Sequence, residues 1–328
     1  MNEKKITYNE LAIRQKLPLE LKENITLRRI AEWIDVHGEE CVYVSYSGGK
    51  DSVVTAHLTH RVNPNIPLVF CDTTLELPEI RSFAMNNPLV TTIKPKRTVR
   101  EVLTKYGYPV VSKDVSNKIY KFRKNNLTDS YRDMLLNGCE KGTMGKIPDC
   151  HKYLIDTDFV SSAHCCSIMK KQPFHAYEKK TGRIACITGE MASESLNRRQ
   201  QYMKYGCNAF DRKQGPKSTP IGFWTEQDVL EYILKYNVDI SSAYGDVVCE
   251  NGKLTTTGEK RTGCIFCLYG LQYDPDRFKR LKEKHPDLYD YCMRGGKHNE
   301  NGEWVPHQGL GMEHVIKQLE GGYEFLHT

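Results

Sequence analysis

The hexapeptide SGGKDS at residues 47–52 constrains the fold more than any other feature of this chain. It follows a short apolar, β-rich run at residues 41–47 and precedes residues 52–60, whose apolar side chains recur at helical spacing. A run with no polar face is typical of a strand buried on both sides of a parallel sheet. The sequence therefore predicts a strand that passes through a Gly-Gly turn directly into a helix.

This strand, turn and helix predict a phosphate site. The first backbone N–H groups of a helix have no partner within it and lie at the positive end of its dipole, so they attract anions. Gly48 and Gly49 allow a phosphate to approach the backbone closely. Lys50 can neutralise its charge, while Ser47 and Ser52 add hydroxyl donors. The spacing matches neither the Walker loop nor the dinucleotide-binding glycine motif, and a glycine-rich turn that binds nothing is the alternative.

Further strands and helices alternate along the chain. Residues 67–72 form a second buried strand, residues 90–93 a weaker third, and residues 183–189 return to the sheet. Residues 98–106 form a helix that begins with a capping box from Thr98 and Glu101. Strands that alternate with helices in this way imply right-handed crossovers and a doubly wound, Rossmann-like parallel sheet of the α/β class.

The chain is expected to divide into three sequential parts. Residues 1–40 form a helical segment, residues 41–215 the nucleotide-binding α/β domain, and residues 216–328 a smaller, mostly helical region with a C-x2-C pair. Within the α/β domain, residues 112–183 are expected to be irregular and are rich in lysine and arginine. A basic face suits a nucleic-acid backbone, and a solvated surface is the alternative.

Cysteine usage is the second informative feature. The 328 residues include 12 cysteines, no apolar run long enough to cross a bilayer, and no apolar core of a secretory signal near the first residue. We therefore expect a soluble, cytoplasmic protein that needs no membrane. In that compartment clustered thiols bind metal or do chemistry rather than form disulfides. The net charge of +6 permits a polyanionic partner.

Two cysteine pairs have the character of metal ligands. Cys165 and Cys166 are adjacent, and Cys264 and Cys267 form a C-x2-C pair, with 97 residues between the two pairs. Four thiolates can hold a tetrahedral zinc or an iron–sulfur cluster. Buried core thiols are the alternative for either pair. Two further candidates for a mixed ligand set are Cys150 and Cys249.

Polar residues follow two other predicted strands, at the strand ends where open α/β sheets bind their ligands. Asp72 ends the second strand, and capping of the following turn is its alternative role. Gly189 and Glu190 follow the later strand, with Arg198 a few residues downstream. An ordinary surface helix explains Arg198 equally well.

Taken together, these motifs resemble the phosphoadenosine phosphosulfate (PAPS) reductase family of the PP-loop ATP pyrophosphatase superfamily, which has the adenine nucleotide alpha-hydrolase fold. The SGGKDS loop resembles the pyrophosphate-binding PP-loop. The resemblance implies that residues 47–52 bind ATP with Mg²⁺, and that Lys50 and Asp51 are catalytic. It also implies that Asp72, Gly189, Glu190 and Arg198 lie near the nucleotide.

The cysteines resemble those of one branch of this family. In adenosine phosphosulfate (APS) reductases, a Cys-Cys pair ahead of basic residues and a proline, with a later C-x2-C pair, holds a [4Fe-4S] cluster. Here Lys170, Lys171 and Pro173 follow the first pair at the matching positions. The resemblance therefore implies that Cys165, Cys166, Cys264 and Cys267 hold such a cluster, with zinc as the alternative.

Two departures from the sulfonucleotide reductases bear on function. Those enzymes carry a cysteine in a Glu-Cys-Gly tail and an incomplete phosphate loop, whereas this chain ends in GGYEFLHT and keeps the complete SGGKDS. The resemblance thus favours ATP-cleaving relatives that put sulfur into nucleic acids, such as the PP-loop protein of DNA phosphorothioation and the iron–sulfur tRNA thiolases. It implies adenylation of an acceptor, in nucleic acid or a small molecule, and sulfur from a donor such as a cysteine desulfurase.

Two other functions stay open. A sulfonucleotide reductase would act on APS or PAPS and release sulfite with thioredoxin. A non-catalytic nucleotide-binding or zinc-stabilised module, acting as a partner in a modification complex, would hold zinc and release no pyrophosphate.

Overall fold

The computed structural model describes residues 5–123, 127–139, 142, 145–271 and 274–319. The chain forms two compact units, each made of two segments: unit 1 is Met1–Lys94 with Pro173–Thr262, and unit 2 is Pro95–Gln172 with Gly263–Thr328. These units differ from the sequential parts expected from the sequence, with boundaries at residues 40 and 215. The reason is that the chain leaves the sheet after its third strand and returns to it only before the fourth.

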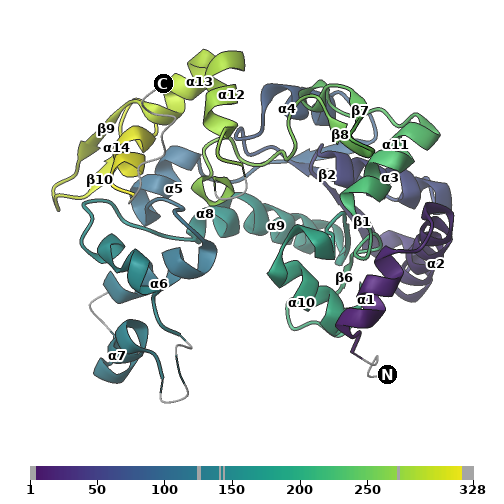
Figure 1. Cartoon of the computed structure of the whole chain (residues 1–328), viewed down its shortest axis with the longest axis horizontal. Helices are drawn as coiled ribbons and strands as arrows, with labels where there is room; N and C mark the ends of the chain where they lie inside the picture. Colours follow the sequence, from purple (N-terminus) through teal and green to yellow (C-terminus); the bar gives the residue numbers. More distant parts are fainter. Residues whose placement is uncertain (1–4, 124–126, 140–141, 143–144, 272–273, 320–328) are drawn as a thin grey trace. The chain divides into compact units, whose positions relative to one another are not determined.

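Unit 1 contains a six-stranded sheet in the order β3-β2-β1-β4-β6-β5. Figure 1 labels β1, β2 and β6 of this sheet. All neighbouring strands are parallel except β5 and β6, which are antiparallel. The strands are β1 Val42–Tyr46, β2 Leu68–Cys71, β3 Val90–Ile93, β4 Ala185–Thr188, β5 Asn208–Ala209 and β6 Lys217–Ser218. Four of them lie within the runs that the sequence predicted as strands, and the predicted α/β class is confirmed.

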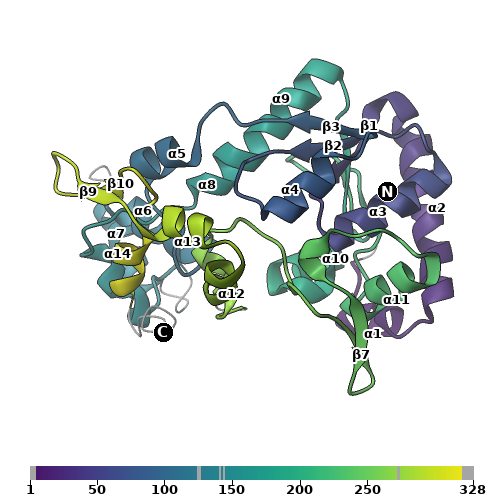
Figure 2. The same cartoon turned by 90° about the horizontal axis from the view of Figure 1, so that it is seen from above.

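Helices cover both faces of this sheet. Successive side chains of a strand point to opposite faces, so each face packs against its own layer of helices. Val42 and Val44 of β1 belong to one large core with Trp33 and Val54 of the helices on that face. Tyr43 faces the other side, where its ring lies 6.0 Å from that of Phe174. Figure 2 shows α3 and α4 on one side of β1 and β3, with α9 on the other. The helices are α1 Tyr8–Gln15, α2 Leu19–His37, α3 Lys50–Val62, α4 Pro78–Met85, α9 Gln172–Thr181, α10 Leu196–Tyr205 and α11 Glu226–Tyr236.

Unit 2 is mainly helical. Its α5 has the predicted capping box of Thr98 and Glu101 and ends at Gly107. Its elements are α5 Val99–Tyr106, α6 Lys113–Arg123, α7 Asp129–Asn137, α8 His164–Cys166, α12 Arg277–Lys284, α13 Pro286–Met293, α14 Met312–Lys317 and the hairpin of β9 Gly296–His298 and β10 Trp304–Pro306. A second hairpin, β7 Val247–Glu250 with β8 Lys253–Thr256, belongs to unit 1.

The expectation that residues 112–183 are irregular was wrong, because α6, α7 and α9 lie within this range. In α6 the buried Val115 and Ile119 are four residues apart and the rest of the helix is mostly polar or charged. These positions do follow helical spacing, and they went unrecognised among the many charged residues of the segment. Among the described residues, no helix combines the length and apolar character that crossing a membrane requires.

Candidate nucleotide site and cysteine cluster

The order of strands identifies one edge of the sheet as a ligand site. From β1 the chain proceeds to β2 and β3 on one side, while β4 and β6 lie on the other. Open α/β sheets bind ligands at such a reversal, beyond the carboxyl ends of the strands. The SGGKDS loop follows β1 and Gly189 follows β4. A Cβ on Gly189 would lie 2.6 Å from the carbonyl oxygen of Asp51, so the two predicted segments are in direct contact.

The loop is closed by its own hydrogen bonds. The Ser52 hydroxyl donates to the carbonyl of Gly49 at 2.8 Å and accepts from the backbone N–H of Ser47 at 3.1 Å. Gly48 has a φ of 74°, and a Cβ there would lie 3.0 Å from the carbonyl oxygen of Ile80. Both serines and Gly48 therefore fix the turn that precedes the helix.

Lys50, the first residue of α3, is a buried cation with only 3% of its surface exposed. Its Nζ lies 3.3 Å from Glu226 Oε1 and 3.5 Å from Asp51 Oδ1. Burial alone would lower the pKa of Lys50, but Asp51, Tyr244 and Glu226 outweigh it and raise the pKa above its usual value. The ammonium group thus stays charged at the amino terminus of the helix.

Among the described residues, the buried Oδ1 of Asp51 makes no hydrogen bond, and its nearby positive charge is Lys50 Nζ at 3.5 Å. Burial raises the pKa of Asp51, while the nearby Lys50 ammonium partly offsets this effect. A carboxylate oxygen of this kind suits a hard divalent cation such as Mg²⁺.

The backbone N–H of Lys50 donates to the hydroxyl of Tyr244 at 3.0 Å, and that hydroxyl is hydrogen-bonded to Thr262 Oγ1 at 2.8 Å. Tyr244 and Thr262 were not predicted as site residues. Tyr244 lies 194 residues after Lys50 in the sequence, and Thr262 lies further still. Neither residue belongs to a motif.

Asp72 lies just beyond β2, where its buried carboxylate pairs with the partly exposed Arg81. It accepts hydrogen bonds from Arg81 Nε at 2.7 Å and Nη2 at 2.8 Å, and from the backbone N–H of Thr74 at 3.2 Å. Arg81 is the main reason that the pKa of Asp72 falls below its usual value. These contacts agree with the turn-capping role, and proximity to a nucleotide stays a prediction.

Glu190 and Arg198 line a small cavity of about 50 Å³. Glu190 forms an ion pair with Lys217 at 2.6 Å, and Arg198 pairs with Glu194. Burial raises the pKa of Glu190, but Lys217 and Arg198 outweigh it and lower the pKa. Arg212 and Lys217 line the same cavity and were missed, because neither belongs to a motif.

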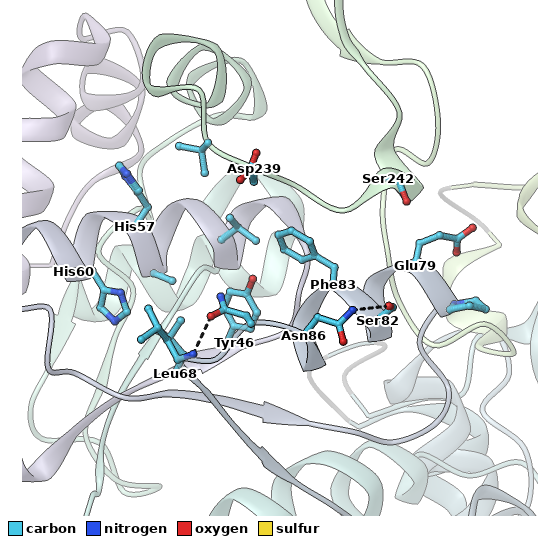
Figure 3. A pocket seen from close by; sticks show the side chains of 16 residues that line it. Tyr46, His57, His60, Leu68, Glu79, Ser82, Phe83, Asn86, Asp239 and Ser242 are labelled. Carbon is cyan, nitrogen blue, oxygen red and sulfur yellow. Dashed lines mark hydrogen bonds between the residues drawn. The ribbon is translucent and has the colours of Figure 1, made fainter.

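A second cavity, of about 930 Å³, lies between α3 and α4 beside β1 (Figure 3). Its lining includes the aromatic rings of Tyr46 and Phe83 and the polar side chains of His57 and Asn86. Of the described residues that line it, none comes from the SGGKDS loop itself. Sequence reasoning missed this cavity because separate segments of unit 1 build it.

All four predicted cysteine ligands lie in unit 2. Burial, followed by the charges of Cys264, Cys166 and Cys267, raises the pKa of Cys165. Burial and the charges of Cys264 and Cys166 likewise raise the pKa of Cys267 to about 11. The two segments that carry the pairs are in contact, because the hydroxyl of Tyr269 donates to the carbonyl of Ser162 at 3.2 Å. The alternative ligands Cys150 and Cys249 are exposed.

Arg277 of α12 holds the C-x2-C turn in shape. Its guanidinium donates to the carbonyl of Cys264 at 2.9 Å and to that of Cys267 at 3.2 Å. The backbone N–H of Cys267 also donates to the carbonyl of Cys264 at 3.1 Å. The other pair precedes a π-helical turn, Ser167–Lys171, a feature often found at functional sites. Arg277 was not predicted, since only the fold brings α12 to this turn.

Comparison with known proteins decides the family. The model of the phosphoadenosine phosphosulfate reductase domain matches residues 41–141 and 143–267. The chain belongs to this family. The match begins one residue before β1 and ends at Cys267, so the PAPS reductase domain includes every residue predicted for the site.

The proteins that are similar to this chain in sequence include an APS reductase. The adenosine 5'-phosphosulfate reductase of Streptomyces coelicolor is 24% identical over 275 residues, which cover 81% of this chain and 87% of the relative. An uncharacterized protein of Methanocaldococcus jannaschii is 24% identical over 258 residues, covering 76% of this chain. The matched part spans only 46% of the length of that relative.

Solved structures similar to this PAPS reductase-family chain include two from yeasts. The PAPS reductase of Candida auris has a TM-score of 0.38 at 17% identity, covering 72% of this chain and 90% of that one. The FMN adenylyltransferase of Candida glabrata has a TM-score of 0.40 at 12% identity, covering 76% of this chain and 68% of that one.

Proposed function

We propose that this member of the PAPS reductase family cleaves ATP between the α and β phosphates, adenylates an acceptor, and uses an iron–sulfur cluster in transferring sulfur to it. The observation that carries the proposal is the complete SGGKDS loop at the reversal of strand order, with Lys50 buried and charged at the helix terminus. Such a loop suits a leaving pyrophosphate, because both its cation and its backbone N–H groups stabilise developing negative charge.

The chain's own residues account for the ATP step as follows. An acceptor oxygen attacks the α phosphorus, the bond to the bridging oxygen breaks, and pyrophosphate leaves against Lys50. The exposed side chain of Glu226 can give way to a phosphate oxygen, because 54% of its surface is open to solvent. Asp51 Oδ1 would hold Mg²⁺, which neutralises charge on the phosphates when bound.

Cys165, Cys166, Cys264 and Cys267 would hold the cluster, which would bind or activate the sulfur. The sulfur then bonds to the adenylated acceptor and AMP leaves. Zinc is the alternative occupant of the same four thiols, because four thiolates can also hold a tetrahedral zinc ion.

The acceptor and the sulfur donor belong to the proposal as well. A nucleic acid or a small molecule would accept sulfur, and a protein such as a cysteine desulfurase would supply it. The basic residues of unit 2 give a nucleic-acid acceptor limited support, because several have partners within the fold. Lys118 pairs with Asp114, and Arg123 donates to backbone carbonyls of Thr157 and Phe159.

A sulfonucleotide reductase is the second candidate, favoured by the match to 87% of the Streptomyces coelicolor APS reductase. Calorimetric titration of anaerobically purified protein distinguishes the two. We expect Mg²⁺ with ATP to bind more tightly than APS or PAPS, and pyrophosphate to appear only with the correct acceptor. Tighter binding of APS or PAPS, together with sulfite release in the presence of thioredoxin, would overturn the proposal in favour of the reductase.

A further inference from the structure

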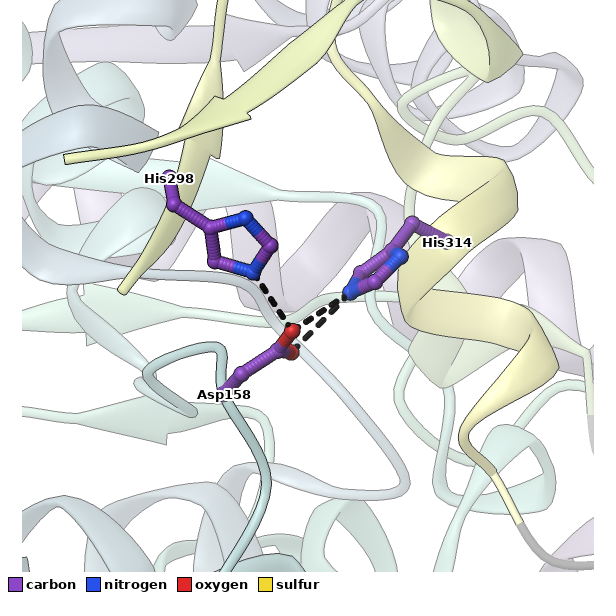
Figure 4. A group of neighbouring side chains, drawn as sticks. All are labelled: Asp158, His298 and His314. Atoms are coloured by element: carbon purple, nitrogen blue, oxygen red, sulfur yellow. Dashed lines mark hydrogen bonds and ion pairs between the residues drawn. The ribbon is translucent and has the colours of Figure 1, made fainter. Parts of the chain in front are cut away.

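A cluster of two histidines and an aspartate lies in unit 2, outside the sites described above (Figure 4). The Nε2 atoms of His298 and His314 lie 2.9 Å and 2.8 Å from Asp158 Oδ2. One potential ligand atom from each residue lies within 4.8 Å of the other two. Figure 4 shows both imidazole rings directed at the carboxylate from different elements, β9 and α14.

We propose that Asp158, His298 and His314 form a binding site for a divalent transition-metal ion. Imidazole nitrogens with one carboxylate are the donor set that zinc and ferrous iron accept, with further coordination positions left open. This site is separate from the four cysteines in its residues and in its ligand chemistry.

The hydrogen bonds of the cluster conflict when no cation is present. His314 Nε2 lies 2.8 Å from Asp158 Oδ2 and 2.6 Å from Gln318 Nε2, and this amide nitrogen lies 2.6 Å from Asp158 Oδ1. If His314 Nε2 carries a proton, it faces an amide donor. If it carries none, its lone pair faces a carboxylate oxygen.

Rotating the Gln318 amide does not remove the conflict, because its oxygen would then face the carboxylate. Both orientations of the Gln318 amide therefore leave one unfavourable contact. A cation resolves the conflict, since the imidazole lone pair, the carboxylate and a rotated amide oxygen can all point toward positive charge.

The surroundings fix the three side chains in place. The Trp304 ring stacks on His314, with ring centres 4.0 Å apart, and meets His298 edge-on at 5.3 Å. The backbone N–H of Trp304 also donates to the carbonyl of Asp158 at 2.7 Å, which ties the aspartate to the hairpin. Preorganised ligands lose little entropy when a metal binds.

The site is open to a second ligand. His314 and Trp304 line a cavity of about 720 Å³. About a third of each of the Asp158 and His314 side chains and 51% of that of His298 are exposed. Water or a small substrate can therefore reach the coordination positions that the protein leaves free.

The test is a calorimetric titration of anaerobically purified, full-length protein with Zn²⁺, with zinc content measured after gel filtration. We expect wild type to retain one more equivalent of zinc than His298→Ala, and to bind it about 100-fold more tightly. His307→Ala is the matched control, because His307 is exposed between the same hairpin and α14 and should behave as wild type.

Asp158→Asn keeps the shape of the side chain, so it tests the proposed metal site if His298→Ala fails to fold. Zinc should raise the melting temperature of wild type and of His307→Ala but not that of Asp158→Asn. Equal zinc retention and equal melting shifts in all the folded proteins would overturn the proposal, and the cluster would then be a hydrogen-bonded brace of the hairpin.

Discussion

The phosphate loop of unit 1 and the cysteine cluster of unit 2 are built in opposite ways. The loop is six consecutive residues that bond to one another, and its cation, Lys50, is already balanced by Asp51 and Glu226. The cluster joins two segments of chain, and burial together with the neighbouring thiols raises the pKa of Cys165 and of Cys267. The loop is therefore organised before its ligand arrives, whereas the thiolates are favourable only once a metal supplies positive charge.

The largest effect is expected from removing a thiol. Cys264→Ser and Cys267→Ser should each abolish cluster binding, so that a protein with about four irons in wild type retains almost none. Unit 2 should also lose stability, because metal binding contributes to its folding. Iron and labile sulfide analysis after anaerobic purification provides the measurement.

Cys41→Ala is the control for these variants, because Cys41 belongs to unit 1 and lies just before β1. It should leave the iron content unchanged. Stoichiometric zinc without labile sulfide in wild type would show that the cluster assignment is wrong and that the thiols form a structural zinc site.

Lys50→Ala tests the loop directly. The variant should keep its fold and lose about 100-fold or more in nucleotide turnover, because a preorganised charge on the leaving group is removed. Lys253→Ala, at an exposed position in the hairpin of unit 1, should turn over as wild type does. Unchanged turnover in Lys50→Ala would contradict the assignment of the loop.

Gly189→Ala asks whether contact between the β4 end and the loop matters. The added Cβ would lie 2.6 Å from the Asp51 carbonyl oxygen, so the loop must shift. We expect nucleotide affinity to fall about 10-fold, equivalent to about 1.4 kcal/mol. Gly263→Ala is the control, because a Cβ there meets nothing within 4 Å. Equal affinity in both variants would mean that the segment after β4 does not shape the site.

The effect expected at Asp72 is on stability rather than on ligand binding, because Asp72 pairs with Arg81 in this structure. Asp72→Asn should destabilise the protein by about 2 kcal/mol at neutral pH, because hydrogen bonds to a charged partner are lost. The pKa of Asp72 is lowered by Arg81, so its contribution is present above the usual value of 3.8 and is lost as pH falls through the lower, folded value.

Denaturant titrations of wild type and Asp72→Asn at several pH values measure this difference. The two curves should converge below about pH 4, where the carboxyl group protonates. Asp211→Asn, at an exposed position in unit 1, should show no such dependence. A constant difference at every pH would mean that the ion pair with Arg81 is not the cause.

What could be predicted from the sequence was mostly local. The strands β1 and β2 were found because runs buried on both sides are mostly apolar, and the loop because SGGKDS is contiguous. The cysteine pairs were found because adjacency and C-x2-C spacing are each visible within four residues. Such features depend on neighbours in the chain, so the sequence alone carries them.

What was missed depends on distant parts of the chain. Arg277 reaches the C-x2-C turn from the next helix, and Tyr244 reaches Lys50 from almost 200 residues away. Asp158 and His314 are separated by 156 positions. None of these residues stands in a motif, and only the fold brings them to their partners.

The division of the chain into discontinuous units also has a consequence for the order of assembly during synthesis. The 90 residues of Pro173–Thr262 belong to unit 1 and form one insertion between the two sequence segments of unit 2. Closing a flexible loop of that length costs about 4 kcal/mol in its length-dependent part. Once unit 1 has folded, both ends of this insertion are held in place. The closure cost then no longer opposes the approach of the two cysteine pairs.

In the sequence, Cys166 lies seven residues before this insertion and Cys264 lies two residues after it. Cys264 and Cys267 therefore leave the ribosome only after all of unit 1 has been synthesised. Any metal that the four thiols bind is therefore taken up late in the synthesis of the chain.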